Sequence, residues 1–267
     1  MQMAKMYESD IEEMAIEELI TIGYQYVSGA DIAPGTLAAE RENYSEVLLR
    51  SRVIQSMKKL NPNMPYKAIL DAYKKLSDYI YSDVVDANEK FHKMLIEGVN
   101  VQYRDDNEVR GDIVKICDFD TPENNEFLAV NQFTIVEKEN NKRPDIILFI
   151  NGIPIVLFEL KNAVDENATI KKAYDQVEAY KGTIPTLFKY NEINIISDGL
   201  EAKAGSLTAS FSRYNSWKTK DGVNEADKYA DELSTLIVGL RLLTKDASCK
   251  RMDCRTYDWF KTNVEFC

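Results

Sequence analysis

Apolar residues in the first hundred positions recur at the spacing expected of helices. Ile11, Ala15 and Leu19 stand four residues apart and so share one face of a helix, which Gly23 ends. The same spacing, interrupted by proline and glycine, predicts three further helices: one at 40–60, one beginning at Pro65 and one at about 83–96. We therefore expect a helical N-terminal part that covers about residues 1–98.

The pattern becomes typical of β-structure after this part. Runs rich in β-branched and aromatic residues predict strands at 99–103, 111–118 and 127–136. The strongest local signal is a pair of apolar runs, IILFI and IPIVLFEL, on either side of Asn151-Gly152, which predicts a hairpin. Both alternate faces of these runs are apolar, so the hairpin belongs in the middle of a sheet that is covered on both sides.

Downstream of the hairpin, the pattern predicts a helix at 169–180, a strand at 194–197 and a last helix at 221–243. Strands interspersed with helices indicate an α/β fold, with a mixed central sheet flanked by helices. On this interpretation the core of the domain covers about residues 99–220.

Composition narrows the classes of function. The 267 residues are 45% hydrophobic and 29% charged, which excludes a disordered or fibrous chain. The formal net charge of −11 argues against a protein that coats nucleic acid, so a DNA contact must be local or assisted by a cation or other subunits. The single histidine, His92, excludes most zinc and histidine-based schemes and is expected on a helix surface or at the edge of the core.

The sequence also indicates a compartment. No apolar run is long enough to cross a bilayer, and the acidic start does not resemble a secretory signal. The four cysteines (Cys117, Cys249, Cys254 and Cys267) are too few and too scattered for a disulfide framework. We expect a soluble protein in a reducing, cytoplasmic setting.

Charged residues at the ends of the apolar hairpin are the candidate chemistry. Asp145 opens the hairpin, while Glu159 and Lys161 close it and, two apart on a strand, share a face. Charged groups beside a core are costly unless they are paired or hold a metal. Two carboxylates and a lysine on one face could form a Mg²⁺ site with a cationic assistant. The alternative is a surface Glu-Lys pair with Asp145 as a turn residue after Pro144.

The turn decides whether the three side chains can meet. A two-residue loop at Asn151-Gly152 pairs Asp145 with Phe158 and places Asp145 and Glu159 on opposite faces. A three-residue loop that begins at Ile150, with Gly152 in a bulge, pairs Asp145 with Leu157 and makes the carboxylates diagonal neighbours on one face. A metal site therefore predicts a bulged turn.

The wider sequence resembles a known family. Arg143-Pro144-Asp145 and Phe158-Glu159-Leu160-Lys161 together resemble the PD-(D/E)xK nuclease signature, and AYDQVEAY is similar to the QxxxY element of nucleases coupled to helicase motors. Other segments resemble the same family: GYQYV, LLRSRVIQSMKKLNP, NEKFHKMLIEGV, LFKYNEINIISDG and AGSLTASFSRYNSWKT. Over about residues 8–240 the chain resembles the N-terminal nuclease domain of the restriction (R) subunit of type I restriction-modification enzymes.

The resemblance implies roles for particular residues. It implies a restriction-endonuclease-like core in which Asp145 and Glu159 are metal ligands, Lys161 is the catalytic lysine and the Leu160 carbonyl is a further ligand. Gln176 and Tyr180, on one helix face, would support the site or contact DNA. A glutamate of the first helix often joins such sites, and the candidates are Glu8 and Glu12; the alternative is a solvated acidic helix face.

The resemblance also implies cofactors and partners. The cofactor would be Mg²⁺, with Mn²⁺ as a substitute. The partners would be double-stranded DNA and the modification and specificity subunits of a type I complex, with no membrane. Cleavage of unmodified foreign DNA would follow ATP-driven translocation, but no G-x-x-x-x-G-K-[ST] loop occurs in the chain, so ATP binding belongs to motor domains that are absent from it.

The expected organisation is an endonuclease domain at 1–243 and an atypical tail at 244–267. The tail loses the apolar rhythm of the family and contains three of the four cysteines, and we interpret it as a shifted reading frame or aberrant terminus. A metal site at Cys249 and Cys254 is the weaker alternative, since no second ligand pair has zinc-like spacing. Two rival functions are a non-catalytic docking module that keeps the nuclease fold and a stand-alone, resolvase-like nuclease.

Overall fold

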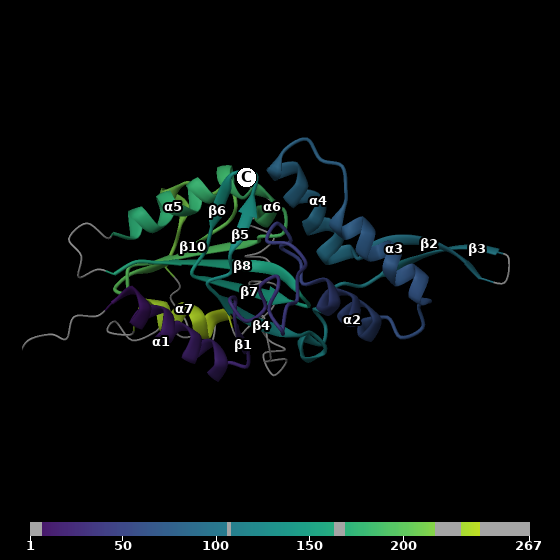
Figure 1. Cartoon of the computed structure of the whole chain (residues 1–267), viewed down its shortest axis with the longest axis horizontal. Helices are drawn as coiled ribbons and strands as arrows, with labels where there is room; N and C mark the ends of the chain where they lie inside the picture. Colours follow the sequence, from purple (N-terminus) through teal and green to yellow (C-terminus); the bar gives the residue numbers. More distant parts are fainter. Residues whose placement is uncertain (1–6, 106–107, 163–168, 217–230, 241–267) are drawn as a thin grey trace, which may run out of the picture.

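The core of the molecule is one mixed β-sheet. The computed structural model describes residues 7–105, 108–162, 169–216 and 231–240. Within this part of the chain, six strands form the sheet in the spatial order β1-β4-β7-β8-β9-β10 (Figure 1). Their bounds are β1 Gln25–Ser28, β4 Phe127–Asn131, β7 Ile146–Ile150, β8 Ile153–Leu160, β9 Ile193–Ser197 and β10 Ala202–Gly205. The β1–β4 and β8–β9 pairs are parallel and the others antiparallel, which confirms the predicted mixed sheet.

Helices cover both faces of this sheet. The helices are α1 Glu8–Thr21, α2 Arg50–Leu60, α3 Tyr66–Ser77, α4 Val84–Glu97, α5 Ile170–Thr183, α6 Pro185–Phe188 and α7 Glu232–Leu240, with short 3-10 turns η1 Pro122–Asn124 and η2 Phe211–Arg213. Figure 1 shows α1 and α7 along one side of the sheet, α5 and α6 along the other, and α2 to α4 beyond one end. The predicted α/β class with flanking helices is therefore confirmed.

The predicted hairpin lies at the centre of the sheet. Every residue of β7 and β8 is buried, because each strand has a neighbour on both edges and helices on both faces. The continuous apolar runs of the sequence reflect this position, since a strand covered on two sides has no face for polar residues.

Local signals located other elements well. The Asp83 side chain accepts hydrogen bonds from Val85 N and Asp86 N at 2.9 Å and so caps the start of α4. The same helix ends at Gly98, whose φ of 83° favours glycine. The predicted helix at 83–96 is thus confirmed, as are the helix at 169–180 and the strand at 194–197 within a few residues.

The helix predicted at 40–60 is wrong in its first half, because α2 begins only at Arg50. Val47, Leu48 and Leu49 are consecutive and all buried, whereas successive side chains of a helix point about 100° apart and could not share one buried face. The Arg41 guanidinium is also buried here, and it donates hydrogen bonds to the carbonyls of Glu46 and Thr134.

Other strand predictions need correction. The strands predicted at 99–103 and 111–118 exist as β2 Val99–Asp105 and β3 Glu108–Val114, but they form a two-stranded ribbon outside the main sheet. The strand predicted at 127–136 is divided at Gln132, whose φ is 51°, into β4 and β5 Ile135–Glu137. Strand β5 pairs with β6 Asn140–Lys142 in a second small ribbon.

The N-terminal part is also not wholly helical. Strand β1 joins the edge of the central sheet, and its four residues are too few to show a strand pattern in the sequence. Of the predicted last helix at 221–243, the structure describes only α7. The tail at 244–267, with Cys249 and Cys254, lies outside the described residues. Among the helices that the structure describes, none combines the length and apolar character needed to cross a membrane.

Candidate active site

The turn of the central hairpin differs from the prediction. The loop is the two-residue type, with φ of 54° at Asn151 and 80° at Gly152, so the expected three-residue bulged turn is wrong. A bulge occurs within the strands instead, where Leu148 pairs with Val156 and Phe149 with Pro154. The extra residue in β8 shifts the register by one, and a shift of one exchanges the two faces.

This displaced bulge brings the predicted site together. Ile146 pairs with Phe158, so Asp145, just before β7, lies opposite Glu159 rather than opposite Leu157. The two carboxylates therefore share the predicted face, as direct neighbours rather than diagonal ones. Lys161 follows β8 directly, and its Nζ is 2.7 Å from Glu159 Oε1, so these three side chains form one cluster.

Asp145 is held by backbone groups. Its Oδ2 accepts a hydrogen bond from Leu160 N at 2.7 Å, and its carbonyl accepts one from Gln132 N at 2.8 Å. Burial raises the pKa of the Asp145 carboxyl to about 6, although the Leu160 amide and the Lys161 ammonium favour the charged form. The aspartate is thus fixed in position and kept in surroundings that disfavour its charge.

Glu159 is the most deeply buried charged group of the cluster. Its side chain is fully inaccessible, and Oε1 accepts the Lys161 hydrogen bond while Oε2 accepts none from any described residue. Burial, together with the nearby Asp145 carboxylate, raises the pKa of Glu159 to about 8, with Lys161 opposing that rise. An unpartnered carboxylate oxygen in the protein interior is costly unless a ligand completes it.

Lys161 connects the two strands to helix α1. Its Nζ donates to Glu159 Oε1, to Glu8 Oε1 at 2.9 Å and to the Leu160 carbonyl at 3.0 Å. Burial lowers the pKa of this ammonium, but the surrounding carboxylates outweigh burial, and the net shift is upward. Three oxygen atoms therefore hold the Lys161 ammonium in a fixed position.

The two glutamates considered on the first helix have different surroundings. Glu8 reaches the cluster through Lys161, and its side chain is 49% exposed. Glu12 instead accepts hydrogen bonds from Asn131 Nδ2 at 2.7 Å and Gln132 Nε2 at 2.5 Å, so each of its oxygens already has a partner. Glu8 thus contacts Lys161 of the cluster directly. Glu12 is connected to the cluster through Gln132, whose backbone amide donates to the Asp145 carbonyl.

Asn131 and Gln132 are residues that the sequence interpretation missed. They link Glu12 of α1 to the end of β4, and Gln132 N in turn binds the Asp145 carbonyl. The available signal was two consecutive amides directly after the apolar run FLAV.

Gln176 and Tyr180 lie on the predicted common face of α5. Gln176 Nε2 donates to the Tyr180 hydroxyl at 2.7 Å, and Tyr180 is 4% exposed. Burial raises the pKa of Tyr180, and the negative charge of Glu159 raises it further. The structure thus brings both residues to the cluster from the side of the sheet opposite α1.

The oxygen atoms of the cluster fit a hard divalent cation. The described residues contain no group of three or more His, Cys, Asp or Glu side chains arranged to hold a metal. The site instead offers two carboxylates and the Leu160 carbonyl, and Mg²⁺ often takes only one or two carboxylates and keeps several waters. The unpartnered Oε2 of Glu159 supplies an oxygen that nothing else in the described structure uses.

His92 and Cys117 have no part in this cluster. His92 Nδ1 lies 3.0 Å from Glu192 Oε2 and its side chain is 15% exposed, which confirms the expected position at the edge of the core. Cys117 is buried and is not in a disulfide.

Comparison with known proteins finds one family over most of the chain. The family described as "Type I restriction enzyme R protein N terminus" matches residues 5–213. The Type I restriction enzyme HindI endonuclease subunit of Haemophilus influenzae is 39% identical over 236 residues, which are 87% of this chain and 22% of that protein. The putative type I restriction enzyme MjaIXP endonuclease subunit of Methanocaldococcus jannaschii is 34% identical over 231 residues, with coverages of 84% and 22%. The chain thus spans about a fifth of the length of these two relatives.

Proposed function

This chain belongs to the family of type I restriction enzyme R protein N termini, and from that premise we propose that it is a DNA endonuclease module that hydrolyses phosphodiester bonds with a divalent cation. The observation that carries the proposal is the cluster of Asp145, Glu159 and Lys161, in which a fully buried carboxylate keeps one oxygen without a partner in the described structure. Such an arrangement is costly in a purely structural site and useful in one that binds a cation.

The proposed cofactor is Mg²⁺, with Mn²⁺ as a substitute. Asp145, Glu159 and the Leu160 carbonyl would hold it, and the cation supplies Lewis-acid activation of the phosphodiester. Lys161 would then place a positive charge where negative charge develops on the phosphate. Its three hydrogen bonds to Glu159, Glu8 and the Leu160 carbonyl keep the ammonium in place before substrate arrives.

Gln176 and Tyr180 have a supporting role in this proposal. Their mutual hydrogen bond orients the phenol beside Glu159 from α5, while Glu8 approaches from α1. Residues of α1 and α5, two helices on opposite sides of the sheet, thus both approach the cluster. The full burial of Glu159 limits the number of rotamers that it can adopt, and pre-organisation of this kind lowers the cost of assembling a site.

The context of the reaction belongs to the complete enzyme. The relatives named above are endonuclease subunits of type I restriction enzymes. We propose that this chain acts within such a subunit on unmodified foreign double-stranded DNA, after ATP-driven translocation by other segments and together with modification and specificity subunits. The acidic composition agrees with this division of labour, because other parts would supply most of the DNA attraction.

A test of the proposal compares two buried glutamates. Calorimetric titration of the chain with Mg²⁺ or Mn²⁺ should show binding that Glu159→Gln abolishes. Glu192→Gln is the matched control, because Glu192 is also fully buried with one oxygen unpartnered in the described structure, but it lies beside His92. Equal titration curves for the wild type and Glu159→Gln would contradict the proposed metal site and would favour the docking module.

The same variants should separate in a supercoiled-plasmid assay with the remaining subunits added. We expect Glu192→Gln to retain nicking and Glu159→Gln to lose it. Cleavage by Glu159→Gln at the wild-type rate would contradict the nuclease assignment itself.

A further inference from the structure

A groove on the outer surface of α2 contains positive charge that has no ion-pair partner among the described residues. The cavity has a volume of about 570 Å³ and is lined by Arg50, Ser51, Ile54, Gln55 and Lys58 of α2 and by Tyr66 at the start of α3. Arg50, Ile54 and Lys58 stand four residues apart and so share one helix face. No carboxylate lines this groove, which we call the α2 groove.

The four basic residues of α2 divide into two pairs. Arg52 forms ion pairs with Glu40 and Glu126, and Lys59 donates to the Asn124 carbonyl at 2.7 Å, so both connect α2 to the rest of the fold. Arg50 and Lys58 are exposed and form no ion pair within the described part of the chain, although the Arg50 guanidinium lies over the Tyr73 ring, 5.6 Å from its centroid. In a protein of net charge −11, the α2 groove thus combines two exposed cations with a lining that contains no carboxylate.

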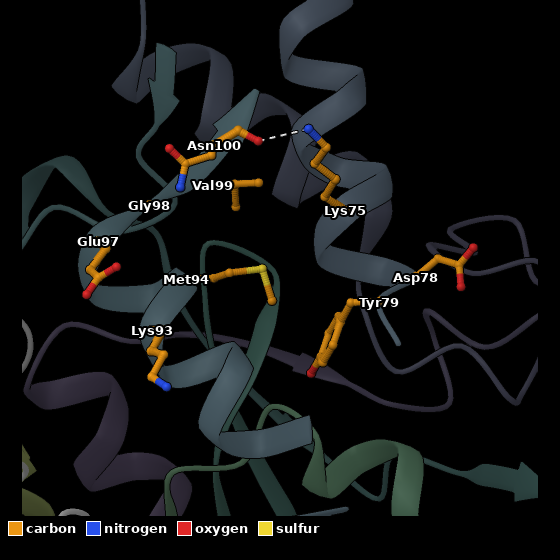
Figure 2. Close-up of a pocket in the computed structure, with 9 residues that line it drawn as sticks. All are labelled: Lys75, Asp78, Tyr79, Lys93, Met94, Glu97, Gly98, Val99 and Asn100. Carbon is orange, nitrogen blue, oxygen red and sulfur yellow. Dashed lines mark hydrogen bonds between the residues drawn. The ribbon is translucent and has the colours of Figure 1, made fainter. Parts of the chain in front are cut away.

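A second cavity differs from the α2 groove because its basic residues have acidic partners. It has a volume of about 310 Å³ and lies between α3, α4 and the start of β2 (Figure 2). Its two lysines are balanced by Asp78 and Glu97. Lys75 pairs with Asp71 and donates to the Asn100 carbonyl, as the dashed line in Figure 2 indicates, and Lys93 pairs with Glu89.

We infer that the α2 groove binds the phosphate backbone of double-stranded DNA. Arg50 and Lys58 would each contact a phosphate, Ser51 and Gln55 add hydrogen-bond donors, and the Tyr66 side chain, 57% exposed, adds a hydroxyl and an aromatic surface. Such contacts fix the position of a duplex without reading its sequence. This inference rests on the proposed function and adds a DNA contact outside the catalytic cluster.

The position of the groove agrees with a role in holding DNA away from the point of cleavage. The start of α2 packs against the hairpin turn, where the Leu49 amide donates to the Gly152 carbonyl at 3.0 Å. Glu159 lies seven residues further along β8, a distance of roughly 23 Å for a strand at about 3.3 Å per residue. A duplex covers that distance in about seven base pairs at roughly 3.4 Å each. The separation of the α2 groove from the cluster is therefore within the length of a short duplex.

The test measures DNA binding without cleavage. Fluorescence anisotropy of a labelled duplex of arbitrary sequence, in EDTA and at low salt, compares the wild-type chain with an Arg50→Gln/Lys58→Gln double variant. We expect the variant to lose roughly tenfold in affinity and to lower the slope of log affinity against log salt by about two, since each phosphate contact contributes about 0.9. Lys75→Gln/Lys93→Gln is the control, because it removes the same charge from the balanced pocket of Figure 2.

The outcomes separate the inference from the proposed function. An equal loss for both double variants would mean that general charge alone attracts DNA, and it would overturn the inference. Wild-type binding too weak to measure at low salt, or an unchanged salt slope in the Arg50→Gln/Lys58→Gln variant, would overturn it as well. Because no metal is present, these results hold whether or not Glu159→Gln abolishes cleavage, so the two hypotheses can fail independently.

Discussion

Buried polar side chains at the two ends of the β7–β8 hairpin differ in how completely they are hydrogen-bonded. At the turn, Asn151 is 1% exposed and its side chain accepts from Glu126 N and donates to the Ile116 carbonyl and to Asn125 Oδ1. At the other end, Glu159 is equally buried, yet one of its oxygens has no partner among the described residues and the other faces a lysine.

This difference agrees with the proposal that Asn151 stabilises the fold whereas Glu159 binds a ligand. A satisfied buried amide adds to stability, whereas an unsatisfied buried carboxylate reduces it. Both ends belong to one short, fully buried hairpin, so the surrounding core does not explain the contrast. The two ends differ in the hydrogen-bond partners that surround the polar side chain, and variants at the two ends should show this difference.

The largest effect should come from Lys161 at the carboxylate end. In a complete R subunit that carries this domain, Lys161→Ala should lower DNA cleavage by roughly a factor of 100 to 1,000, because a fixed positive charge beside the phosphate is lost. Asp145→Ala and Glu159→Ala should lower it at least as much. ATP hydrolysis, measured in the same preparations, should stay close to that of the wild type.

An exposed lysine supplies the reference for that experiment. Lys93→Ala removes a side chain that is 62% exposed and lies on α4, so it should leave cleavage unchanged. Retained cleavage by Lys161→Ala, or equal losses in both variants, would remove Lys161 from the site.

The next largest effect should come from the turn. Asn151→Ala leaves the Glu126 amide, the Ile116 carbonyl and the Asn125 side chain without their partner, and we expect a loss of about 3 kcal/mol in the free energy of unfolding. Urea denaturation provides the measurement. Asn151→Gly tolerates the positive φ but makes none of these bonds, so a nearly wild-type stability for this variant would show that conformation, not hydrogen bonding, is what Asn151 contributes.

A smaller effect of opposite sign is expected for Glu159→Gln in EDTA. The folded-state pKa of Glu159 is raised from 4.5 to about 8, so the stability that its protonated form contributes is present below pH 4.5 and is lost as the pH rises towards 8. Glutamine resembles the protonated form at every pH. The variant should therefore unfold at a higher urea concentration than the wild type at pH 8, with a difference that shrinks towards pH 5. A difference independent of pH would contradict the assignment of the effect to this carboxyl.

The smallest effect should come from the supporting pair on α5. Tyr180→Phe removes the hydroxyl that accepts from Gln176, and we expect a loss of about 1 kcal/mol in stability and a fall in cleavage of less than roughly tenfold. A double-mutant cycle with Gln176→Ala should show that the two losses are not additive, because both variants break the same hydrogen bond. Fully additive losses would mean that the pair does not act as a unit.

Much of the candidate site could be predicted from the sequence because its signals are local. Glu159 and Lys161 had to share a face, since they are two apart on a strand, and their contact at 2.7 Å confirms this. Gln176 and Tyr180 are four apart on a helix and meet for the same reason. The roles of these residues stay predictions until the variants are measured.

The location of the bulge could not be predicted from local sequence patterns. The turn at Asn151-Gly152 was recognised, but the extra residue needed to align the carboxylates was expected in the turn and occurs at the Leu148–Phe149 step. At this point the Ile155 carbonyl accepts a hydrogen bond from Glu192 N, a group 37 residues further along the chain. A partner so distant leaves no local pattern in the sequence.

The sequence by itself determined the elements whose signals lie within a few neighbouring residues: the capped helix α4, the buried hairpin and the spacing of charged residues along each strand and helix. Only the tertiary structure decided that β1 joins the sheet, that β2 and β3 leave it, and that Asp145 faces Glu159. These outcomes depend on which distant groups satisfy each other's hydrogen bonds and fill each other's volume. Because these hydrogen bonds and packing contacts join segments that are far apart in the sequence, they can place two acidic side chains against the core in a way that no single stretch of sequence specifies.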